Sequence, residues 1–109
     1  MKKSNSSIFY KLHYSQDSLI LALCDSELIG KKFSDSKIIL DLDTFKNFYL
    51  GEELVLSKAK ELFEQCDSIN LVGKNSVEIA KALGYINEND IRYIQNVPHV
   101  QIYKIFNKG

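Results

Sequence analysis

The run LILALC, Leu19 to Cys24, restricts the fold more than any other feature, because it is apolar at every position. Such a run is typical of a central β-strand covered on both faces, or of a short buried helix. The preceding stretch IFYKLHY, residues 8–14, alternates between apolar and polar faces, as a half-buried strand does. A short polar turn, residues 15–17, separates the two stretches and favours an antiparallel hairpin.

Four further strands are predicted. KIILDLD, residues 37–43, alternates, with Ile39 and Asp41 on the face opposite its other apolar residues. Residues 69–72 form a short apolar strand, 91–94 a short strand or extended segment, and 100–106 the last strand. Residues 44–56 fit no clean period and are interpreted as a packed connection with one helical turn.

Two amphipathic helices are also predicted. The first follows an N-cap at Ser57, with apolar residues at helical spacing up to Cys66. The second begins with a capping-box-like Asn75 and Glu78 and ends before Gly84, which is placed at C′. A strand, one glycine and a helix also resemble a phosphate-binding turn, but the further Gly-Lys-Ser/Thr spacing is missing, so helix geometry is the favoured explanation.

The element order β-β-β-α-β-α-β-β predicts an α+β fold, a two-layer single domain with a mostly antiparallel sheet and two main helices. A chain of 109 residues with 45% hydrophobic and 26% charged residues needs one core only. We expect residues 8–109 to form this domain and residues 1–7 to be a frayed N-terminus.

The charge and the cysteine content argue against several classes of protein. Fourteen basic and fourteen acidic side chains give neutrality, so there is no DNA-binding signature and no strong electrostatic argument for RNA. Two cysteines are too few for a disulfide scaffold or a zinc site. No apolar run is long enough for a signal sequence or a membrane span, so a cytoplasmic protein without a cofactor is expected.

The stretch NVPHVQIYKIF, residues 96–106, holds the single proline and one of two histidines. Pro98 cannot donate to a sheet, so it is expected before the strand rather than within it. Because side chains alternate along a strand, His99 and Gln101 share a face with Tyr103. These polar groups could contact a ligand, or they could hydrogen-bond nearby backbone and fix the strand edge.

Four spaced segments stand out, which are CDSELIGKKF (24–33), FYLGEELV (48–55), NLVGKNSVEIAKALG (70–84) and VPHVQ (97–101). Together they resemble the archaeal domain-of-unknown-function family 424 (DUF424), in a match that runs over nearly the whole chain from about Ile8. Leu50 departs from the pattern, since a small residue is expected before Gly51. The resemblance implies a small archaeal cytosolic protein, loosely associated with translation, and no established activity. The family's polar positions correspond to Cys24, Asp25, Glu27, Tyr49, Asn70, His99 and Gln101.

Three hypotheses of function follow. In the first, a non-enzymatic recognition module binds RNA or a protein through Asn70, His99, Gln101, Asp25 and Tyr49, and the neutral charge makes a protein at least as suitable a partner as RNA. In the second, a thiol hydrolase uses Cys24 as nucleophile and His99 as base, with Asp25 or Asn70 orienting the imidazole. The third is a structural, homo-oligomeric interaction protein.

A metal site from His13, His99 and Asp25 would require folding to bring them together, and none is expected.

Overall fold

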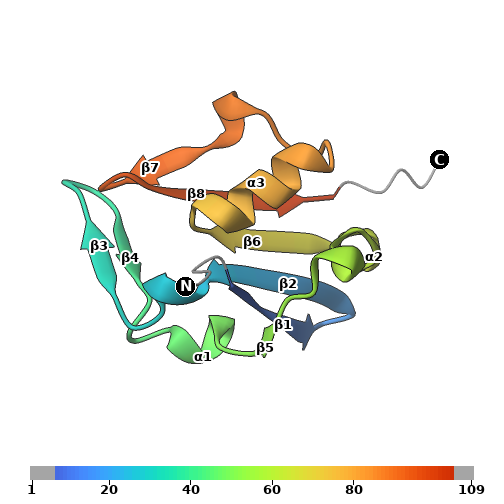
Figure 1. Cartoon of the computed structure of the whole chain (residues 1–109). Coiled ribbons are helices and arrows are strands. Elements are labelled where there is room, and N and C mark those ends of the chain that lie inside the picture. The colour runs from blue at the N-terminus through green and yellow to red at the C-terminus, as the bar shows by residue number, and fades with distance from the viewer. Residues whose placement is uncertain (1–6, 105–109) are drawn as a thin grey trace, which may run out of the picture.

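The computed structural model describes residues 7–104, and a six-stranded sheet forms its centre (Figure 1). The strand order is β5-β1-β2-β6-β8-β7. The bounds are β1 (Ile8–Ser15), β2 (Ser18–Asp25), β5 (Glu52–Glu53), β6 (Ser68–Val72), β7 (Arg92–Ile94) and β8 (Val97–Tyr103). β2 and β6 are parallel, and the other neighbouring strands are antiparallel. LILALC therefore forms a central strand, as one of its two interpretations predicted.

The remaining elements are a small hairpin, three helices and three single turns. The hairpin joins β3 (Lys32–Ser34) to β4 (Ile39–Asp41). The helices are α1 (Lys46–Tyr49), α2 (Ala59–Gln65) and α3 (Lys74–Ala82), and the 3-10 turns are η1 (Ser26–Leu28), η2 (Leu56–Lys58) and η3 (Glu88–Asp90). The α+β class, the mostly antiparallel sheet and the two main helices are confirmed, whereas the short strands β3 and β5 were not predicted. The predicted N-cap at Ser57 is wrong, because Ser57 lies within η2 and α2 begins after Lys58 without a side-chain cap.

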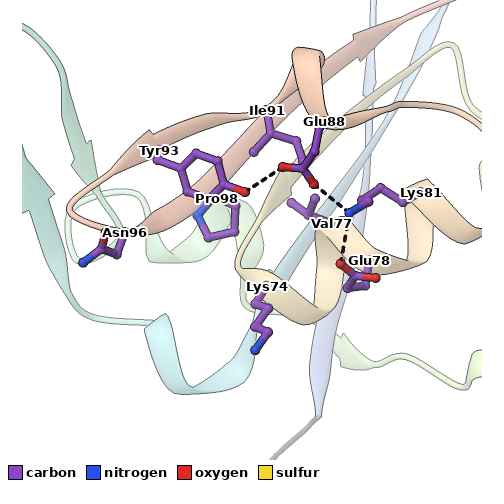
Figure 2. Close-up of a pocket in the computed structure, with 9 residues that line it drawn as sticks. All are labelled: Lys74, Val77, Glu78, Lys81, Glu88, Ile91, Tyr93, Asn96 and Pro98. Carbon is purple, nitrogen blue, oxygen red and sulfur yellow. Dashed lines mark hydrogen bonds and ion pairs between the residues drawn. The ribbon is translucent and has the colours of Figure 1, made fainter.

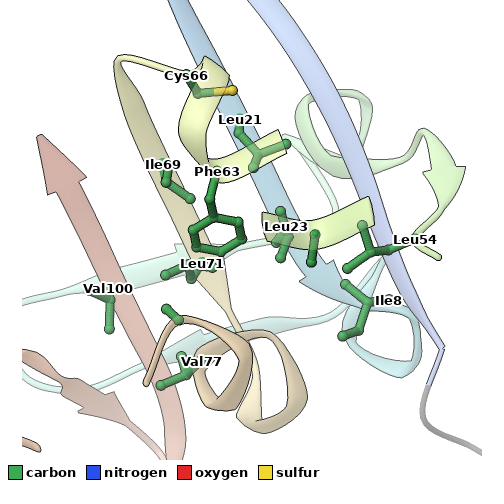
Figure 3. Close-up of a cluster of buried hydrophobic side chains, with 12 residues drawn as sticks. Ile8, Leu21, Leu23, Leu54, Phe63, Cys66, Ile69, Leu71, Val77 and Val100 are labelled. Carbon is green, nitrogen blue, oxygen red and sulfur yellow. The ribbon is translucent and has the colours of Figure 1, made fainter. Parts of the chain in front are cut away.

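Helices α2 and α3 cover the first face of the sheet (Figure 3). Leu21 and Leu23 of β2 pack with Ile69 and Leu71 of β6 against Phe63 of α2, and all five side chains are fully buried. Burying a large apolar side chain stabilises a fold by about 1.5–3 kcal/mol. This cluster is therefore the main core of the domain.

The β3–β4 hairpin and α1 cover part of the second face. Cys24 and Val72 lie beneath Leu40, Leu42 and Tyr49 in a separate buried cluster. Farther along β6 and β8, polar residues replace the apolar ones, and the strands are only partly covered. The second face is thus apolar at one end and polar at the other.

Pro98 lies within β8, so its predicted position before the strand is wrong. It pairs with Tyr93 across a two-residue turn, Gln95-Asn96, whose positive φ angles of 51° and 69° fit a type I′ hairpin. On the other side, Gly73 N–H donates to Pro98 O over 2.9 Å. Because proline has no N–H to return, the Gly73 carbonyl accepts instead from Val77 N–H of α3, at 3.0 Å.

The strand β8 also begins earlier than predicted, at Val97 rather than Val100. The predicted residues 105–106 lie outside the described part of the chain. The predicted frayed segment lies outside it too, except for Ser7, whose carbonyl accepts from Ser26 N–H.

Asp25, at the end of β2, caps the N-terminus of α3. Its carboxylate accepts from Asn75 N–H at 2.9 Å and from Ser76 N–H and Oγ–H at 2.8 Å each. The predicted capping box of Asn75 and Glu78 is wrong, because the N-cap is Gly73, two residues before Asn75, and no side chain of the helix itself caps it. The helix C-terminus is as predicted, with Gly84 at φ 84° and Tyr85 N–H donating to Ala80 O.

Gly73 makes this cap possible. Its φ of 108° is strained for other residues, and a Cβ there would lie 2.4 Å from Asp25 Cγ. The parallel register of β2 and β6 pairs Cys24 with Val72, so the following residues, Asp25 and Gly73, lie side by side. Asp25 can therefore reach the helix only past a residue without a side chain.

We expect Asp25→Ala to lower the free energy of unfolding by about 2–4 kcal/mol, because it leaves the two N–H groups and the buried Ser76 hydroxyl without their acceptor. Urea denaturation followed by circular dichroism measures this change. Asp43→Ala, at an exposed loop position, is the control and should change stability by less than about 0.5 kcal/mol. Equal effects of the two substitutions would contradict the assigned role of Asp25.

Candidate functional site

A hollow of about 300 Å³ opens on the second face, between the β3–β4 hairpin, α1 and the strands β6 and β8. β4 and α1 form its walls, and side chains of β6 and β8 form its floor. Its lining consists of Ile39, Leu40, Asp41, Leu42, Phe45, Phe48, Tyr49, Asn70, His99 and Gln101.

The polar floor joins three residues from two strands. Asn70 lies directly opposite Gln101 in the β6–β8 ladder, and His99 lies opposite Val72, two residues after Asn70 in β6. Because alternate residues share a face, the three polar side chains turn toward the same side of the sheet. Alternation along the last strand predicted that His99 and Gln101 share a face. The β6–β8 register places Asn70 beside them.

The floor has free hydrogen-bonding capacity. Within residues 7–104, the Asn70 amide and the His99 imidazole have no hydrogen-bond partner, and Gln101 Oε1 accepts from the Tyr103 hydroxyl at 3.2 Å. The sequence left two roles open for His99, which were contact with a ligand and hydrogen bonding to nearby backbone. Among the described residues no such backbone hydrogen bond is found, so the Asn70 amide and the His99 imidazole are available to a bound molecule.

The α1 wall is fixed by stacked rings. The Phe48 ring stacks on His13 with centroids 4.2 Å apart, and His13 Nε2 lies 2.8 Å from the Phe48 carbonyl oxygen. The Tyr49 ring meets Phe48 edge-on and is nearly buried. Burial, and secondarily the nearby Cys24 thiol, raises the pKa of Tyr49, so its phenol stays protonated and can donate.

His99 is electrostatically set to be neutral. Its side chain is half-buried, and Arg92 lies directly opposite it in β7. Burial first, and the Arg92 charge second, lower the pKa of His99 from its ordinary value. A neutral imidazole offers one donor and one acceptor to the hollow.

Asp25 and Cys24, two other predicted site residues, do not line the hollow. The Asp25 carboxylate is 2% exposed and is committed to α3. Cys24 is fully buried, and the register Cys24–Val72–His99 separates it from His99 by two strand spacings, about 9.5 Å between backbones. The geometry therefore offers no nucleophile–base pair for the thiol-hydrolase hypothesis.

The side chains that the sequence suggested for a metal or phosphate site include His13 and Asp25, and both make hydrogen bonds within the protein. His13 is bonded to Phe48 and Asp25 to α3, and among residues 7–104 no three His, Cys, Asp or Glu side chains group as metal ligands do. The glycine turn before α3 is filled by the Asp25 carboxylate, in the position where a helix N-terminus would hold a phosphate.

Sequence reasoning missed the apolar rim of the hollow. Ile39 is 69% exposed and Phe45 is 61% exposed. One signal was present, because Ile39 lies on the polar face of an alternating strand beside Asp41. Phe45 lies in the aperiodic connection and gave no comparable signal.

A second cavity, of about 200 Å³, lies on the other side of the sheet between α3 and β7 (Figure 2). Figure 2 shows the Lys81 amino group between Glu78 and Glu88, at 3.4 Å and 2.7 Å, with the Tyr93 hydroxyl 3.2 Å from Glu88. These charged groups pair with one another and hold η3 and β7 against α3. The second cavity is therefore a suitable control surface.

The fold and the hollow define a small α+β domain with a polar-floored hollow on one face of its sheet. Residues 13–105 match the model of the family described as "Protein of unknown function (DUF424)", and the chain belongs to this family. It is similar to a solved structure, an uncharacterized conserved protein from Methanopyrus kandleri, with a TM-score of 0.75 and 25% identity over 95% of this chain and 100% of that one. None of the curated proteins matches it. Among the described helices, none has the length and apolar character needed to cross a membrane.

We expect both cysteines to react slowly with iodoacetamide in the native protein at pH 7.5. Burial raises the pKa of Cys24 to about 12 and that of Cys66 to about 11, so almost no reactive thiolate forms. Mass spectrometry of timed samples should show labelling at least about a hundredfold slower than in urea. Rapid native labelling of Cys24 alone would restore the thiol-enzyme hypothesis.

We expect an NMR titration to give His99 a pKa below its ordinary value of 6.5, and Arg92→Gln to raise it. Between the lowered native pKa and 6.5, the unfolded chain holds a proton that the native protein lacks. The free energy of unfolding therefore falls as the pH decreases from 6.5 toward the native pKa. His99→Gln should remove this part of the pH dependence. A native pKa at or above 6.5 is the contrary result.

Proposed function

We propose that the chain is a non-enzymatic recognition module, and that the hollow on the second face is its binding site. The observation that carries the proposal is the convergence of Asn70, His99 and Gln101 on one opening, with the Asn70 side-chain amide and the His99 imidazole unpaired within residues 7–104. Unpaired polar groups beside exposed apolar side chains are typical of surfaces that become covered in a complex.

The lining favours a protein partner over RNA. Among residues 7–104, the lining contains no lysine or arginine, and RNA affinity comes largely from neutralised phosphates. Its exposed apolar side chains, Ile39 and Phe45, suit the apolar centre of a protein interface. Translation, which the family resemblance implies, is the first cellular setting in which to look for this partner.

The proposal is tested by comparing the wild type with two variants, one triple and one double, as affinity baits in an extract of the native cells. Asn70→Ala/His99→Ala/Gln101→Ala removes the polar floor, and Lys74→Ala/Glu78→Ala alters the control surface. We expect the wild type and the control to retain a common protein that the floor variant retains about tenfold less, because truncating central interface residues costs about 1–2 kcal/mol or more. Calorimetry with the purified partner must reproduce this difference.

Single-stranded RNA of 12 nucleotides and mixed sequence is the second probe. We expect no saturable fluorescence-anisotropy change near 0.15 M salt, since the lining lacks cations. Saturable RNA binding that the floor variant loses would instead make RNA the partner. If the floor variant retains every captured protein as the wild type does, the proposed site is wrong.

A further inference from the structure

Among residues 7–104, one edge of β4 pairs with no other strand. In the β3–β4 hairpin, Leu40 faces Phe33, and the hydrogen bonds on either side join Leu42 N–H to Lys31 O at 2.8 Å and Asp35 N–H to Ile38 O at 3.0 Å. Hydrogen-bonded and non-bonded positions alternate along an antiparallel pair. Ile39 and Asp41 therefore direct their N–H and C=O groups away from β3.

These groups are largely free. The Asp41 carbonyl accepts from Phe45 N–H at 3.3 Å. Among the hydrogen bonds outside the β3–β4 ladder within residues 7–104, none uses the N–H or C=O of Ile39 or the N–H of Asp41. An edge with unpaired main-chain groups is a template for another strand.

The free edge borders the hollow. Residues 39–42 line it, and Figure 1 shows β3 on the outside of the hairpin with β4 nearer the six-stranded sheet. An added strand on this edge would lie beside the floor residues Asn70 and His99 and against the exposed side chains of Ile39 and Phe45. Main-chain pairing and side-chain selection would thus occur in one place.

We propose that an extended, uncharged segment of a partner protein adds as a strand to the free edge of β4. This proposal rests on the recognition function proposed above and specifies its mode. The main chain of the segment pairs with Ile39 and Asp41, its apolar side chains contact Ile39 and Phe45, and its polar groups meet the floor.

Charge complementarity favours an uncharged segment. Among residues 7–104, the one ionised side chain in the lining is Asp41, whose carboxylate already accepts from Asp43 N–H and Thr44 N–H and lies 3.6 Å from Lys32 Nζ. These hydrogen bonds lower the pKa of Asp41, so it stays ionised and paired. A charged segment would find no free counter-charge in the lining, whereas neutral amides find acceptors and donors.

The test uses linear 12-residue peptides selected by phage display on the immobilised full chain, with the tightest peptide then synthesised as the probe. Ile39→Pro removes the edge N–H but leaves the β3–β4 hydrogen bonds, because the alternation of bonded positions directs the Ile39 N–H away from β3. Ile39→Val keeps the N–H and the branched side chain and is the matched control. Two-dimensional NMR spectra verify that both variants are folded.

We expect Ile39→Pro to weaken peptide binding about tenfold, as the loss of one hydrogen bond worth about 1.4 kcal/mol does, and Ile39→Val to change it less than about threefold. In the wild type, the amides of Ile39 and Asp41 should become protected from hydrogen exchange on binding. N-methylation of alternate peptide amides should abolish binding in one register only, because only alternate residues face β4.

The contrary outcomes distinguish a failure of strand addition from a failure of the recognition site. Peptides that need Asn70, His99 and Gln101 but bind Ile39→Pro like the wild type overturn strand addition and leave the recognition site in place. If no selected peptide is affected by the floor variant, both fail. A concentration-dependent dimer in light scattering that Ile39→Pro dissociates would show that a second copy, not a partner protein, occupies the edge.

Discussion

The contact between the Asp25 carboxylate and the N-terminus of α3 is the constraint on which the rest of the domain depends. It requires parallel pairing of β2 with β6, because only that register places Asp25 beside Gly73. It also depends on Pro98, whose missing N–H leaves the Gly73 carbonyl free to begin the hydrogen bonding of α3. Three distant segments thus fix α3, one of the two helices that cover the first face. The buried carboxylate of Asp25 is in turn stabilised by its hydrogen bonds and by the positive end of this helix.

The same register decides which face carries the site. With Cys24 opposite Val72 and Val72 opposite His99, the second face changes along the strands from a buried apolar cluster to the polar floor. Asp25 fills the helix N-terminus on the other face, so that position is closed to anionic ligands. Available polar groups and exposed apolar side chains therefore meet at the hollow, where the hairpin stops covering the sheet.

Sequence patterns predicted what depends on neighbours along the chain. The alternation of residues 8–14, the apolar run that follows, the periodicity up to Cys66 and the turn at Gly84 all specify local geometry, and the structure has each of them. They did not show that β2 and β6 pair in parallel, that Asp25 caps a helix 50 residues away, or that Pro98 lies within a strand. For the site, alternation united His99 with Gln101, but only the β6–β8 register adds Asn70.

The sheet also divides by chain order: β5, β1 and β2 come from the first part of the sequence, and β6, β8 and β7 from the last. The β2–β6 ladder is the seam between these halves, and its closure must bring together strands separated by more than forty residues, which makes it slow among the steps of folding. The hollow straddles this seam, since β4 and α1 belong to one half while β6 and β8 belong to the other. A molecule seated there therefore cross-links the two halves, and its binding free energy opposes their separation.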